Sequence, residues 1–333
     1  MVVNYRTPDL TMQCLAALAR ERGRLPSLTA MVVDGGSGDG SAAILSEALA
    51  HPDYRDWAAL LPLSINGGYG WANNQAILTL AQHGSAPEFI HILNPDAEVA
   101  EGAVAALVED LQANGESGAA GSQLIDADGK PAASAFRFPS PAREFAGAAQ
   151  SEVLRGLLGI KGIVVSSPVS CAVDWVTGAS VMFRTDALRD VGLFDDGFFL
   201  YFEEVELMHR LRSSGWSVRH VPASRVVHIE GSATGVGARA TERPFPPYWY
   251  RSRRRYFRLT GGAPLLAAAN LSALAGQAIA GLKRLAGRRP PNRSLRSVDF
   301  IRRSLWTPAA EKRASVPRLG DPPGRPPAWM TTR

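Results

Sequence analysis

The sequence predicts an α/β protein with a mostly parallel sheet flanked by helices, and two observations support this prediction. Short apolar runs alternate with helical patterns through the first 120 of the 333 residues, an order typical of a parallel sheet covered by helices. Polar residues directly follow several of the apolar runs, and ligands bind at the carboxyl ends of the strands in such sheets.

Four strands are expected in the first part of the chain, each followed by a helix. The expected strands span residues 1–4, 28–33, 62–65 and 89–93, and the expected helices span 8–24, 41–49, 71–83 and 101–113. In the first of these helices the apolar positions recur at helical spacing and form one face. The first strand is short, so we expect either a stunted strand that weakens this part of the sheet or a misassigned start codon.

The alternation becomes less regular from residue 121 onward. The expected elements are a hairpin-like excursion around 123–129, a variable loop or helix over 139–168, a strand over 173–184, helices over 185–191 and 203–214, a strand over 216–221 and a flexible glycine-rich loop over 231–237. No repeat of 20–50 residues is visible, which excludes a solenoid.

The composition indicates a globular protein with an unevenly distributed charge. Hydrophobic residues make up 46% of the chain and charged residues 20%, which excludes a wholly disordered chain. From Arg239 onward, 20 Lys and Arg stand against 4 Asp and Glu, a net charge of +16, whereas the preceding residues carry −11. A basic tail on an acidic body indicates an anionic partner or a solvated terminus. Cys14 and Cys171 form no CxxC motif, which argues against a zinc ribbon and fits a reducing compartment.

The C-terminal third combines basic, aromatic and apolar segments. Aromatic residues and arginines are mixed over 248–258, a pattern that suits the headgroup region of an anionic membrane, although a helix packed on the body or an RNA contact is an alternative. The uncharged segment 263–282 is mostly Ala and Gly, so we expect an interfacial or packed helix rather than a membrane span. The Pro- and Arg-rich composition beyond residue 288 predicts progressive loss of order. No signal peptide is expected, because no basic region precedes an apolar run at the start.

Three polar segments follow expected strands and are candidates for a ligand site. Asp34 precedes a loop of Gly, Ser and Asp, where a carboxylate can accept a hydrogen bond from a nucleobase or a ribose. Asn66 opens the loop Asn-Gly-Gly-Tyr-Gly-Trp, whose glycines let the backbone approach a phosphate, and no Lys-Ser/Thr pair follows as in a P-loop. Asp96, in Asn-Pro-Asp, can bind Mg²⁺ or Mn²⁺ that bridges a diphosphate. Each of these residues can alternatively form a turn or cap a helix.

Two further segments carry titratable groups in apolar surroundings. Five aromatic residues from Phe194 to Phe202 precede Glu203 and Glu204, and an apolar wall raises the pKa of a carboxylate toward the range of a general base. Acidic residues are also favoured in the first turn of any helix. His228 follows an apolar run and precedes a Gly/Ser loop, so it is a candidate metal ligand or phosphate contact, or a structural histidine.

The order and spacing of these motifs, from Val-Val-Asn-Tyr-Arg-Thr to Val-Val-His, resemble the family 2 glycosyltransferases, in particular the rhamnosyltransferase-like enzymes of bacterial cell-wall and surface polysaccharide. The resemblance runs from about Val2 to about Arg258. It implies a GT-A fold with a basic helical C-terminal extension and an inverting transfer from a nucleotide-diphospho-sugar, aided by Mg²⁺ or Mn²⁺. The implied acceptor is lipid-linked or a polysaccharide, at an anionic membrane surface on the cytoplasmic face, and no nucleic acid is expected.

The resemblance also implies roles for regions and for single residues. The catalytic domain would span 1–238, with a nucleotide-sugar half at 1–120 and an acceptor and catalytic half at 121–238, followed by a membrane-proximal region at 239–288 and a tail at 289–333. Donor contacts would come from Asn4, Asp34, Asn66, Gly67, Asn74, Asn94 and Asp96. Acceptor contacts would come from Trp175, Gly178 and Ala179. Asp96 and His228 would hold the metal, and Glu204 would be the general base with Glu203 beside it.

The chain departs from the family pattern at two places. Glu203-Glu204-Val205-Glu206 stands where Glu-Asp-x-Asp is usual, and Gly35 stands where Asn is common. A displacement of about 1 Å can cost about 10²-fold in rate, so a non-catalytic homologue that binds nucleotide-sugar or glycan is the alternative function. The expected donor is dTDP-rhamnose, and UDP-sugars stay open because Asp34 would accept the N3–H of uracil or thymine alike.

Overall fold

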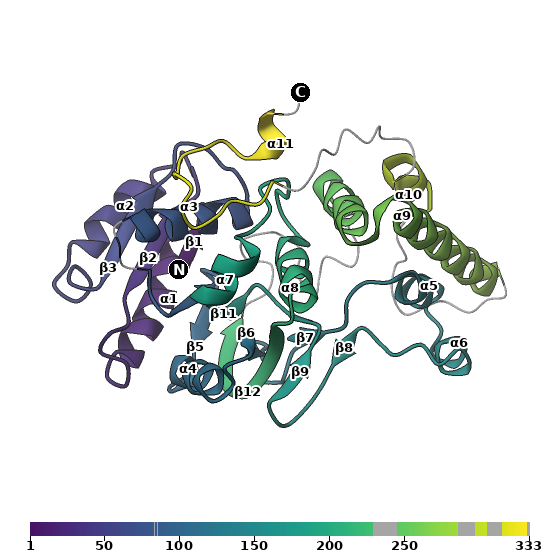
Figure 1. Ribbon diagram of the computed structural model, residues 1–333, viewed down its shortest axis with the longest axis horizontal. Coiled ribbons are helices and arrows are strands. Elements are labelled where there is room, and N and C mark those ends of the chain that lie inside the picture. The colour runs from purple at the N-terminus through teal and green to yellow at the C-terminus, as the bar shows by residue number, and fades with distance from the viewer. Residues whose placement is uncertain (83, 85, 229–244, 286–296, 305–314, 332–333) are drawn as a thin grey trace.

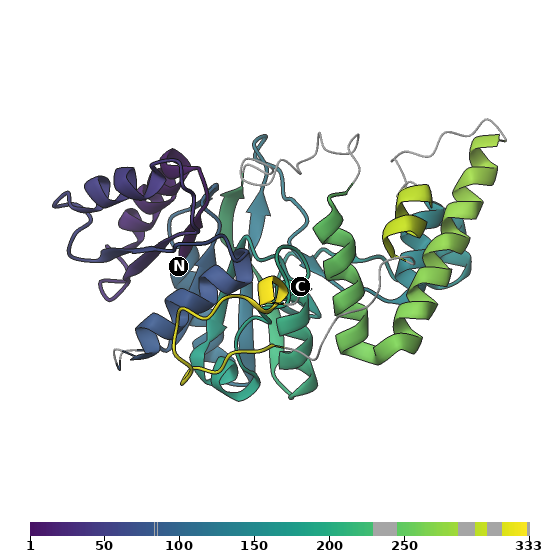
Figure 2. The ribbon, with the colours of Figure 1, turned by 90° about the horizontal axis from the view of Figure 1, so that it is seen from above.

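The computed structural model describes residues 1–82, 84, 86–228, 245–285, 297–304 and 315–331 of the chain (Figure 1). A central sheet is flanked by helices, and a group of helices that includes α5, α6, α9 and α10 lies to one side of it (Figures 1 and 2). The predicted glycine-rich loop at 231–237 lies outside the described residues.

The main sheet has nine strands, in the order β3-β2-β1-β4-β11-β6-β12-β5 with β9 also paired to β12. Its strands are β1 (Val2–Asn4), β2 (Ala30–Asp34), β3 (Ala58–Pro62), β4 (Phe89–Leu93), β5 (Ala97–Val99), β6 (Ser117–Ile125), β9 (Cys171–Val173), β11 (Ser180–Arg184) and β12 (Ser217–His228). A second sheet joins β10 (Trp175–Val176), β7 (Ala135–Phe136) and β8 (Val164–Val165). The run β3-β2-β1-β4 is parallel, which confirms the predicted core, whereas β11 runs antiparallel to β4 and β6.

The helices around the main sheet confirm the predicted alternation. They are α1 (Pro8–Glu21), α2 (Ser41–Leu49), α3 (Tyr69–Gln82), α4 (Ala103–Ala113), α7 (Thr185–Val191) and α8 (Glu203–Ser213). One apolar layer packs residues of α1, α2 and α4, among them Leu15, Leu45 and Leu107, and another packs residues of α3, α7 and α8, among them Ile77 and Leu207. The two layers cover the sheet and leave its carboxyl edge for the polar residues.

Three predicted strands differ from the structure. The third strand is Ala58–Pro62 rather than 62–65, because this earlier stretch pairs along its whole length with β2. The strand expected over 173–184 is divided among β9, β10 and β11. The strand expected to end at residue 221 continues as β12 to His228, through an irregularity between Val221 and Arg225 that contains Pro222. Proline interrupts a sheet ladder because it lacks an N–H, so the sequence pattern hides the continuation.

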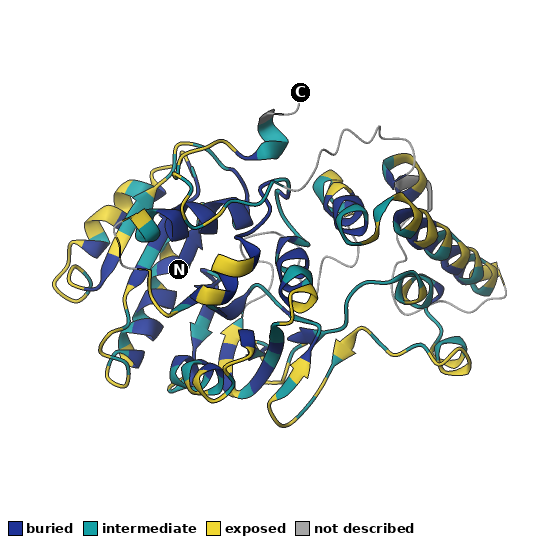
Figure 3. Cartoon of the chain, viewed as in Figure 1, coloured by how far each residue is buried: buried dark blue, intermediate teal, exposed yellow. Residues whose placement is uncertain are grey.

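Helices α9 (Pro247–Leu285) and α10 (Ser297–Ser304) form the C-terminal helical extension. Helix α9 packs on α5 (Pro141–Ala149), which is followed by α6 (Glu152–Leu157). A kink at Gly261 and Gly262 divides α9, and its second part packs closely on α5, since a Cβ on Gly276 would lie 2.5 Å from the carbonyl oxygen of Phe145. By length and composition alone α9 passes as a membrane-crossing helix, but 39% of its most apolar window is buried inside the protein. Much of its opposite face is exposed (Figure 3).

Three arginines of the aromatic and basic segment are buried instead of facing outward. Arg253 pairs with Glu144 on α5 at 2.8 Å, and Arg255 pairs with Asp195 at 2.7 Å. Arg254 is also buried. The prediction that these arginines meet a membrane surface is therefore wrong for these three side chains, which join α9 to the rest of the protein.

The described part of the C-terminal tail is packed against the body. Residues 315–331 cross over α3 and end in the short helix α11 (Ala328–Thr331), as Figure 2 shows in yellow. The predicted loss of order beyond residue 288 therefore does not hold for this segment or for α10.

Candidate active site at the carboxyl edge of the sheet

The topology brings several strand ends to one edge of the sheet. Strands β1, β2 and β4 run parallel, so Asn4, Asp34 and the residues after Leu93 lie at the same edge. Strand β11 begins opposite Leu93, and β12 ends with His228 opposite Ala97. Residues more than a hundred positions apart in sequence therefore meet there.

A cavity of about 450 Å³ opens at this edge. Its lining includes eight of the predicted site residues: Asn66, Asn94, Asp96, Gly178, Ala179, Glu203, Glu204 and His228. A larger cavity of about 860 Å³ lies at the other edge of the sheet, beside Thr29 and Phe89 at the starts of β2 and β4. Its lining residues are mostly apolar. We assign the candidate site to the smaller cavity, because convergent polar groups in a concave space mark functional sites more reliably than size does.

Asp34 is buried at the end of β2 and held by its neighbours. Its Oδ1 accepts hydrogen bonds from Asn4 Nδ2 at 2.7 Å and from the Ser37 hydroxyl at 2.6 Å, and its Oδ2 accepts one from the Ser37 backbone at 3.1 Å. Asn4 in turn accepts from Thr11 Oγ1 at 3.1 Å. Asn4 therefore orients the Asp34 carboxylate rather than pointing freely into the cavity, and the adjacent Gly35 lines the cavity.

The loop of residues 66–70 is packed too closely for larger side chains. Gly68 has a φ of +96°, and a Cβ there would lie 2.0 Å from the carbonyl oxygen of Phe199. The Tyr69 backbone N–H donates to the same oxygen at 3.2 Å, and Asn66 Oδ1 accepts from the Gly68 N–H at 3.1 Å. Gly67 has no room for a Cβ beside the ring of Trp71. These contacts join the glycine loop to the segment that precedes α8.

Asp96 and His228 form the most suitable pair for a metal ion. The Oδ1 of Asp96 lies 3.2 Å from Nε2 of His228, and Nδ2 of Asn94 lies 3.3 Å from the same nitrogen. Asp96 is buried, and its Oδ1 makes no well-aligned hydrogen bond among the described residues, its contact with His228 included. An oxygen and an imidazole nitrogen placed in this way fit a divalent cation. No group of three or more His, Cys, Asp or Glu suited to a metal occurs within the described residues, so other ligands would have to complete the coordination.

Glu203 and Glu204 begin helix α8 at the wall of the cavity. Each has an Oε2 without a hydrogen-bond partner among the described residues. Burial raises the pKa of Glu203 well above its ordinary value, and the charge of Glu204 adds to this shift. Burial also raises the pKa of Glu204, against hydrogen bonds from the backbone of Val205 and Gly178 that lower it. Carboxylates with raised pKa values beside a cavity are suited to general-base chemistry.

The backbone immediately before these glutamates is strained. Tyr201 and Phe202 both have a φ of +69°, a conformation that costs non-glycine residues on the order of 1–3 kcal/mol each. Such residues persist only where the surrounding structure over-determines them, and they gather at functional sites. The strain therefore marks the start of α8 independently of the acidic side chains.

Five predicted contact residues do not line the cavity: Asn4, Asp34, Gly67, Asn74 and Trp175. The last two are held by other contacts. Asn74 is fully buried in α3 and donates to the Phe194 carbonyl and to Asp196 Oδ1, both at 2.8 Å. Trp175 stacks on Phe136 with ring centroids 4.2 Å apart. Asn74 thus contacts the loop before α8 and not a sugar donor in the cavity. Trp175 packs within the second sheet and not against an acceptor.

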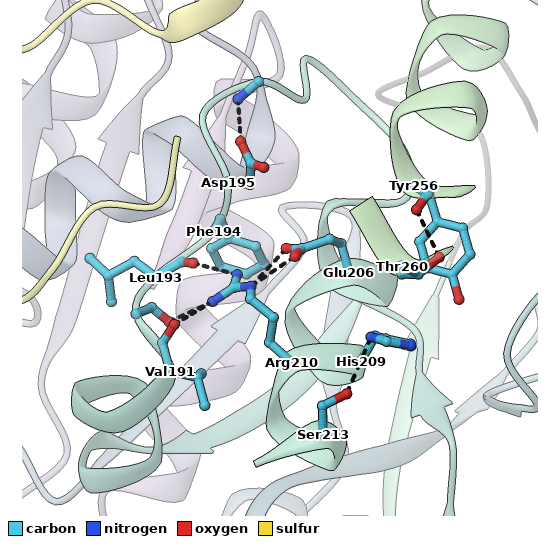
Figure 4. Close-up of polar contacts among 12 residues, drawn as sticks. Val191, Leu193, Phe194, Asp195, Glu206, His209, Arg210, Ser213, Tyr256 and Thr260 are labelled. Carbon is cyan, nitrogen blue, oxygen red and sulfur yellow. Dashed lines mark hydrogen bonds and ion pairs between the residues drawn. The ribbon is translucent and has the colours of Figure 1, made fainter. Parts of the chain in front are cut away.

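Two other carboxylates near α8, those of Glu206 and Asp195, are paired with guanidinium groups. Glu206 accepts two hydrogen bonds from Arg210 at 2.8 and 3.0 Å, and Arg210 also donates to the carbonyls of Val191 and Leu193 (Figure 4). Asp195 accepts from Arg255 at 2.7 and 2.9 Å. These groups hold the loop and the helix in place.

Aromatic residues also line the cavity, among them two of the predicted apolar run before Glu203 and three that the sequence did not assign to the site. Their ring-bearing side chains come from four parts of the chain: Tyr5, Tyr69, Phe199 with Tyr201, and Tyr248. Tyr201 and Tyr248 stack with ring centroids 6.0 Å apart. For Tyr248, the signal in the sequence was the mixture of aromatic residues and arginines at 248–258, but this mixture indicates a membrane-binding surface as readily as a ligand site.

Comparison with known families gives two matches that together cover most of the chain. The model of "Glycosyl transferase family 2" matches residues 1–139, and that of "Glycosyl transferase family group 2" matches residues 148–301. The N-acetylglucosaminyl-diphospho-decaprenol L-rhamnosyltransferase of Mycobacterium tuberculosis is 29% identical over 239 residues, 66% of this chain and 71% of that protein. Rhamnosyltransferase WbbL of Escherichia coli is 36% identical over 56 residues, which cover 17% of this chain and 21% of that protein.

Solved structures share the fold at low sequence identity. The mannosyltransferase PcManGT from Pyrobaculum calidifontis, in complex with GDP-Man and Mn²⁺, has a TM-score of 0.51 at 17% identity, covering 87% of this chain and 75% of that one. GalNAc-T7 with UDP, GalNAc and Mn²⁺ has a TM-score of 0.53 at 13% identity, covering 92% of this chain and 56% of that one. The predicted GT-A fold is confirmed.

Proposed function

We propose, from the premise that this chain belongs to glycosyltransferase family 2 and is a glycosyltransferase, that it inverts the anomeric centre of a nucleotide-diphospho-sugar during transfer. The proposed donor is dTDP-rhamnose, and the proposed acceptor is a lipid-linked or polysaccharide glycan of the cell envelope. The observation that carries the proposal is the meeting of Glu203 and Glu204 with the Asp96–His228 pair around one cavity.

Glu204 is proposed as the general base. It takes the proton of an acceptor hydroxyl while that oxygen attacks the anomeric carbon, and the bond from this carbon to the nucleotide diphosphate breaks on the opposite face. Its raised pKa supports this role, since a base works best with a pKa near the operating pH. Glu203 places a second carboxylate at the same wall.

Asp96 and His228 are proposed to hold Mg²⁺ or Mn²⁺. When bound, the ion offsets the charge that develops on the leaving diphosphate. The buried Asp96 oxygen without a well-aligned hydrogen bond among the described residues supports this assignment. Two protein ligands suit an ion that also contacts substrate phosphates, as Mg²⁺ commonly does. Two solved neighbours hold Mn²⁺.

The nucleobase is proposed to contact Asp34. The hydrogen bonds from Asn4 and Ser37 occupy Oδ1 and one position of Oδ2, and a carboxylate oxygen has room for a further donor. The N3–H of thymine or uracil is such a donor. The proposed diphosphate site is the glycine loop that begins at Asn66.

The acceptor side is proposed to lie at the cytoplasmic face of the cell membrane. The Mycobacterium tuberculosis relative is named for a decaprenol-linked substrate, which supports a lipid-linked acceptor. On α9 the side chains of Leu271, Leu282 and Leu285 are 68%, 66% and 87% exposed, and such an apolar face suits a membrane surface.

The test of the proposal is calorimetric titration of dTDP, UDP and GDP into the full chain, with and without Mn²⁺. We expect dTDP or UDP to bind more tightly with Mn²⁺. Asp96→Asn should weaken the Mn²⁺-dependent binding by at least about tenfold, whereas Asp53→Asn, an exposed residue distant from the site, should bind like the wild type. A folded wild-type protein that binds none of the nucleotides would refute the proposal.

A further inference from the structure

The C-terminal segment 315–331 lies outside both family matches and contacts the loop before α8. The Ser315 backbone N–H donates to Asp195 Oδ1 at 3.2 Å, and its carbonyl accepts from the Asp196 N–H at 2.8 Å. The Leu193 N–H donates to the Pro317 carbonyl at 2.9 Å. The segment is therefore hydrogen-bonded to the loop that leads into the glutamates.

The same segment then follows helix α3 toward the glycine loop. The Gly324 N–H donates to Gln75, and Trp71 Nε1 donates to the Arg325 carbonyl at 2.8 Å. Trp329 Nε1 donates to the Gly67 carbonyl at 3.0 Å. Three hydrogen bonds thus tie the segment to α3 and to the loop at its start (Figures 1 and 2).

Trp329 connects the two loops that form the cavity wall. Its ring meets the Phe199 ring edge to face, with centroids 5.1 Å apart, while its indole N–H reaches Gly67. Phe199 lines the cavity, and its carbonyl accepts the Tyr69 N–H. One half-buried side chain therefore contacts the glycine loop on one side and the segment before Glu203 on the other.

The loop before α8 needs such support because its backbone is strained, and the glycine loop is packed tightly against it. Tyr201 and Phe202 occupy the left-handed region, and Gly68 approaches Phe199 so closely that no Cβ fits between them. Strained residues relax when the contacts that over-determine them are lost. A relaxation of about 1 Å at a reacting centre is enough to cost about 10²-fold in rate.

We propose that residues 315–331 form a strap that completes the active site, and that Trp329 is a positioning residue which holds the donor loop against the segment leading to Glu203 and Glu204. This inference rests on the proposed function, because it assigns the glycine loop to the donor. The strap acts through Gly67 and Phe199, so its effect is on donor binding and on the alignment of the base.

The experiment compares Trp329→Ala and Trp329→Phe with a matched control. Trp216 is also a half-buried tryptophan, and its Nε1 donates to Asp190 at 3.1 Å beside the start of β12, at the opposite end of that strand from His228. Trp216→Phe therefore removes an indole hydrogen bond away from the site. Calorimetry with dTDP or UDP plus Mn²⁺ gives the dissociation constant, and thermal unfolding checks that each variant is folded.

We expect Trp329→Ala to weaken nucleotide binding by roughly 10- to 100-fold. Trp329→Phe keeps an aromatic ring against Phe199 and loses only the hydrogen bond to Gly67, so the loss should be roughly 2- to 10-fold. Trp216→Phe should bind like the wild type. This graded loss would be the signature of positioning, since a merely destabilising substitution lowers the melting temperature without changing the affinity of the folded protein.

Two results would overturn the strap. One is wild-type nucleotide affinity in folded Trp329→Ala, and the other is an equal loss of affinity in Trp216→Phe. If the wild-type protein itself binds no nucleotide, the proposed function fails instead, so the two failures are distinguishable.

Discussion

The carboxylates around the start of α8 occupy two contrasting settings. Glu206 is buried against the guanidinium group of Arg210 (Figure 4), and Asp195 is buried against that of Arg255. These pairs fix the helix and the loop. Glu203 and Glu204 lie within three residues of Glu206 on the same helix, yet they have no ion-pair partner among the described residues and face the cavity. Acidic residues close together in sequence are thus divided between supporting the fold and performing chemistry.

Asp196 represents an intermediate setting between these two. Its carboxylate accepts a hydrogen bond from the amide of Asn74 at 2.8 Å. An amide satisfies one oxygen without supplying a charge, and burial raises the pKa of Asp196 to about 7. The comparison teaches that burial and the partner of each carboxylate together determine which role it can take, because burial raises the pKa of Glu206 as well, against the lowering effect of Arg210. Three experiments on these carboxylates and on Arg210 test this comparison, from the largest expected effect to the smallest.

Glu204→Gln should separate activity from stability most clearly. The amide cannot accept the hydroxyl proton, so the rate should fall about 10²- to 10⁴-fold while nucleotide binding persists. Glu206→Gln, on the same helix, removes a charge partner of Arg210 and should instead lower the free energy of unfolding while the folded protein keeps its rate. Steady-state kinetics and urea unfolding of both variants make the test. Equal rates for the two variants would contradict the role of Glu204.

Arg210→Met should destabilise the fold because it leaves Glu206 buried without its charge partner. Arg210 also donates to the carbonyls of Val191 and Leu193, so the loss reaches the loop before Asp195. Removing one partner of a buried ion pair typically costs about 3–5 kcal/mol. The matched control is Arg24→Met, which breaks the exposed Arg24–Glu101 pair and should cost no more than about 1 kcal/mol in urea unfolding. Similar losses of unfolding free energy in both variants would contradict the expectation that the buried ion pair stabilises the fold more than the exposed one.

Much of the parallel half of the fold could be predicted from the sequence, because local patterns determine it. The apolar runs that end at Asp34 and Leu93 are continuous, and the turn residues that follow them are local signals. Strand β12 illustrates the opposite case, since its continuation past Pro222 depends on pairing with β6 and β5. Pairing between strands that are distant in sequence produces no local pattern, so this continuation could not be predicted from the sequence.

The candidate site shows the same division. The meeting of Asp96, Glu204 and His228 at one cavity could be predicted, because their residue types and their order resemble a known family. The location of Asn74 could not be predicted, because its side chain makes three hydrogen bonds to residues 120 or more positions away. Trp329 was hidden for the same reason, in a tail whose Pro- and Arg-rich composition predicts disorder.

The pH dependence of stability gives the finest test of the comparison, through Asp196→Asn. Asp196 has a pKa of about 7 in the folded protein and about 4 when unfolded, so the native state binds the additional proton between these values. The free energy of unfolding therefore falls as the pH rises through this window, by at most about 4 kcal/mol, because each pKa unit is worth about 1.4 kcal/mol.

Asp196→Asn stays neutral and keeps an oxygen that accepts from Asn74, so the part of the slope due to Asp196 should disappear. The variant should match the wild type in urea unfolding at pH 4 and exceed it at pH 8. Parallel profiles would show that Asp196 does not titrate in this range. In that case the amide of Asn74 would be sufficient to keep the buried Asp196 carboxylate ionised. Glu203 and Glu204, whose pKa values are also raised by burial, would be the groups to replace next.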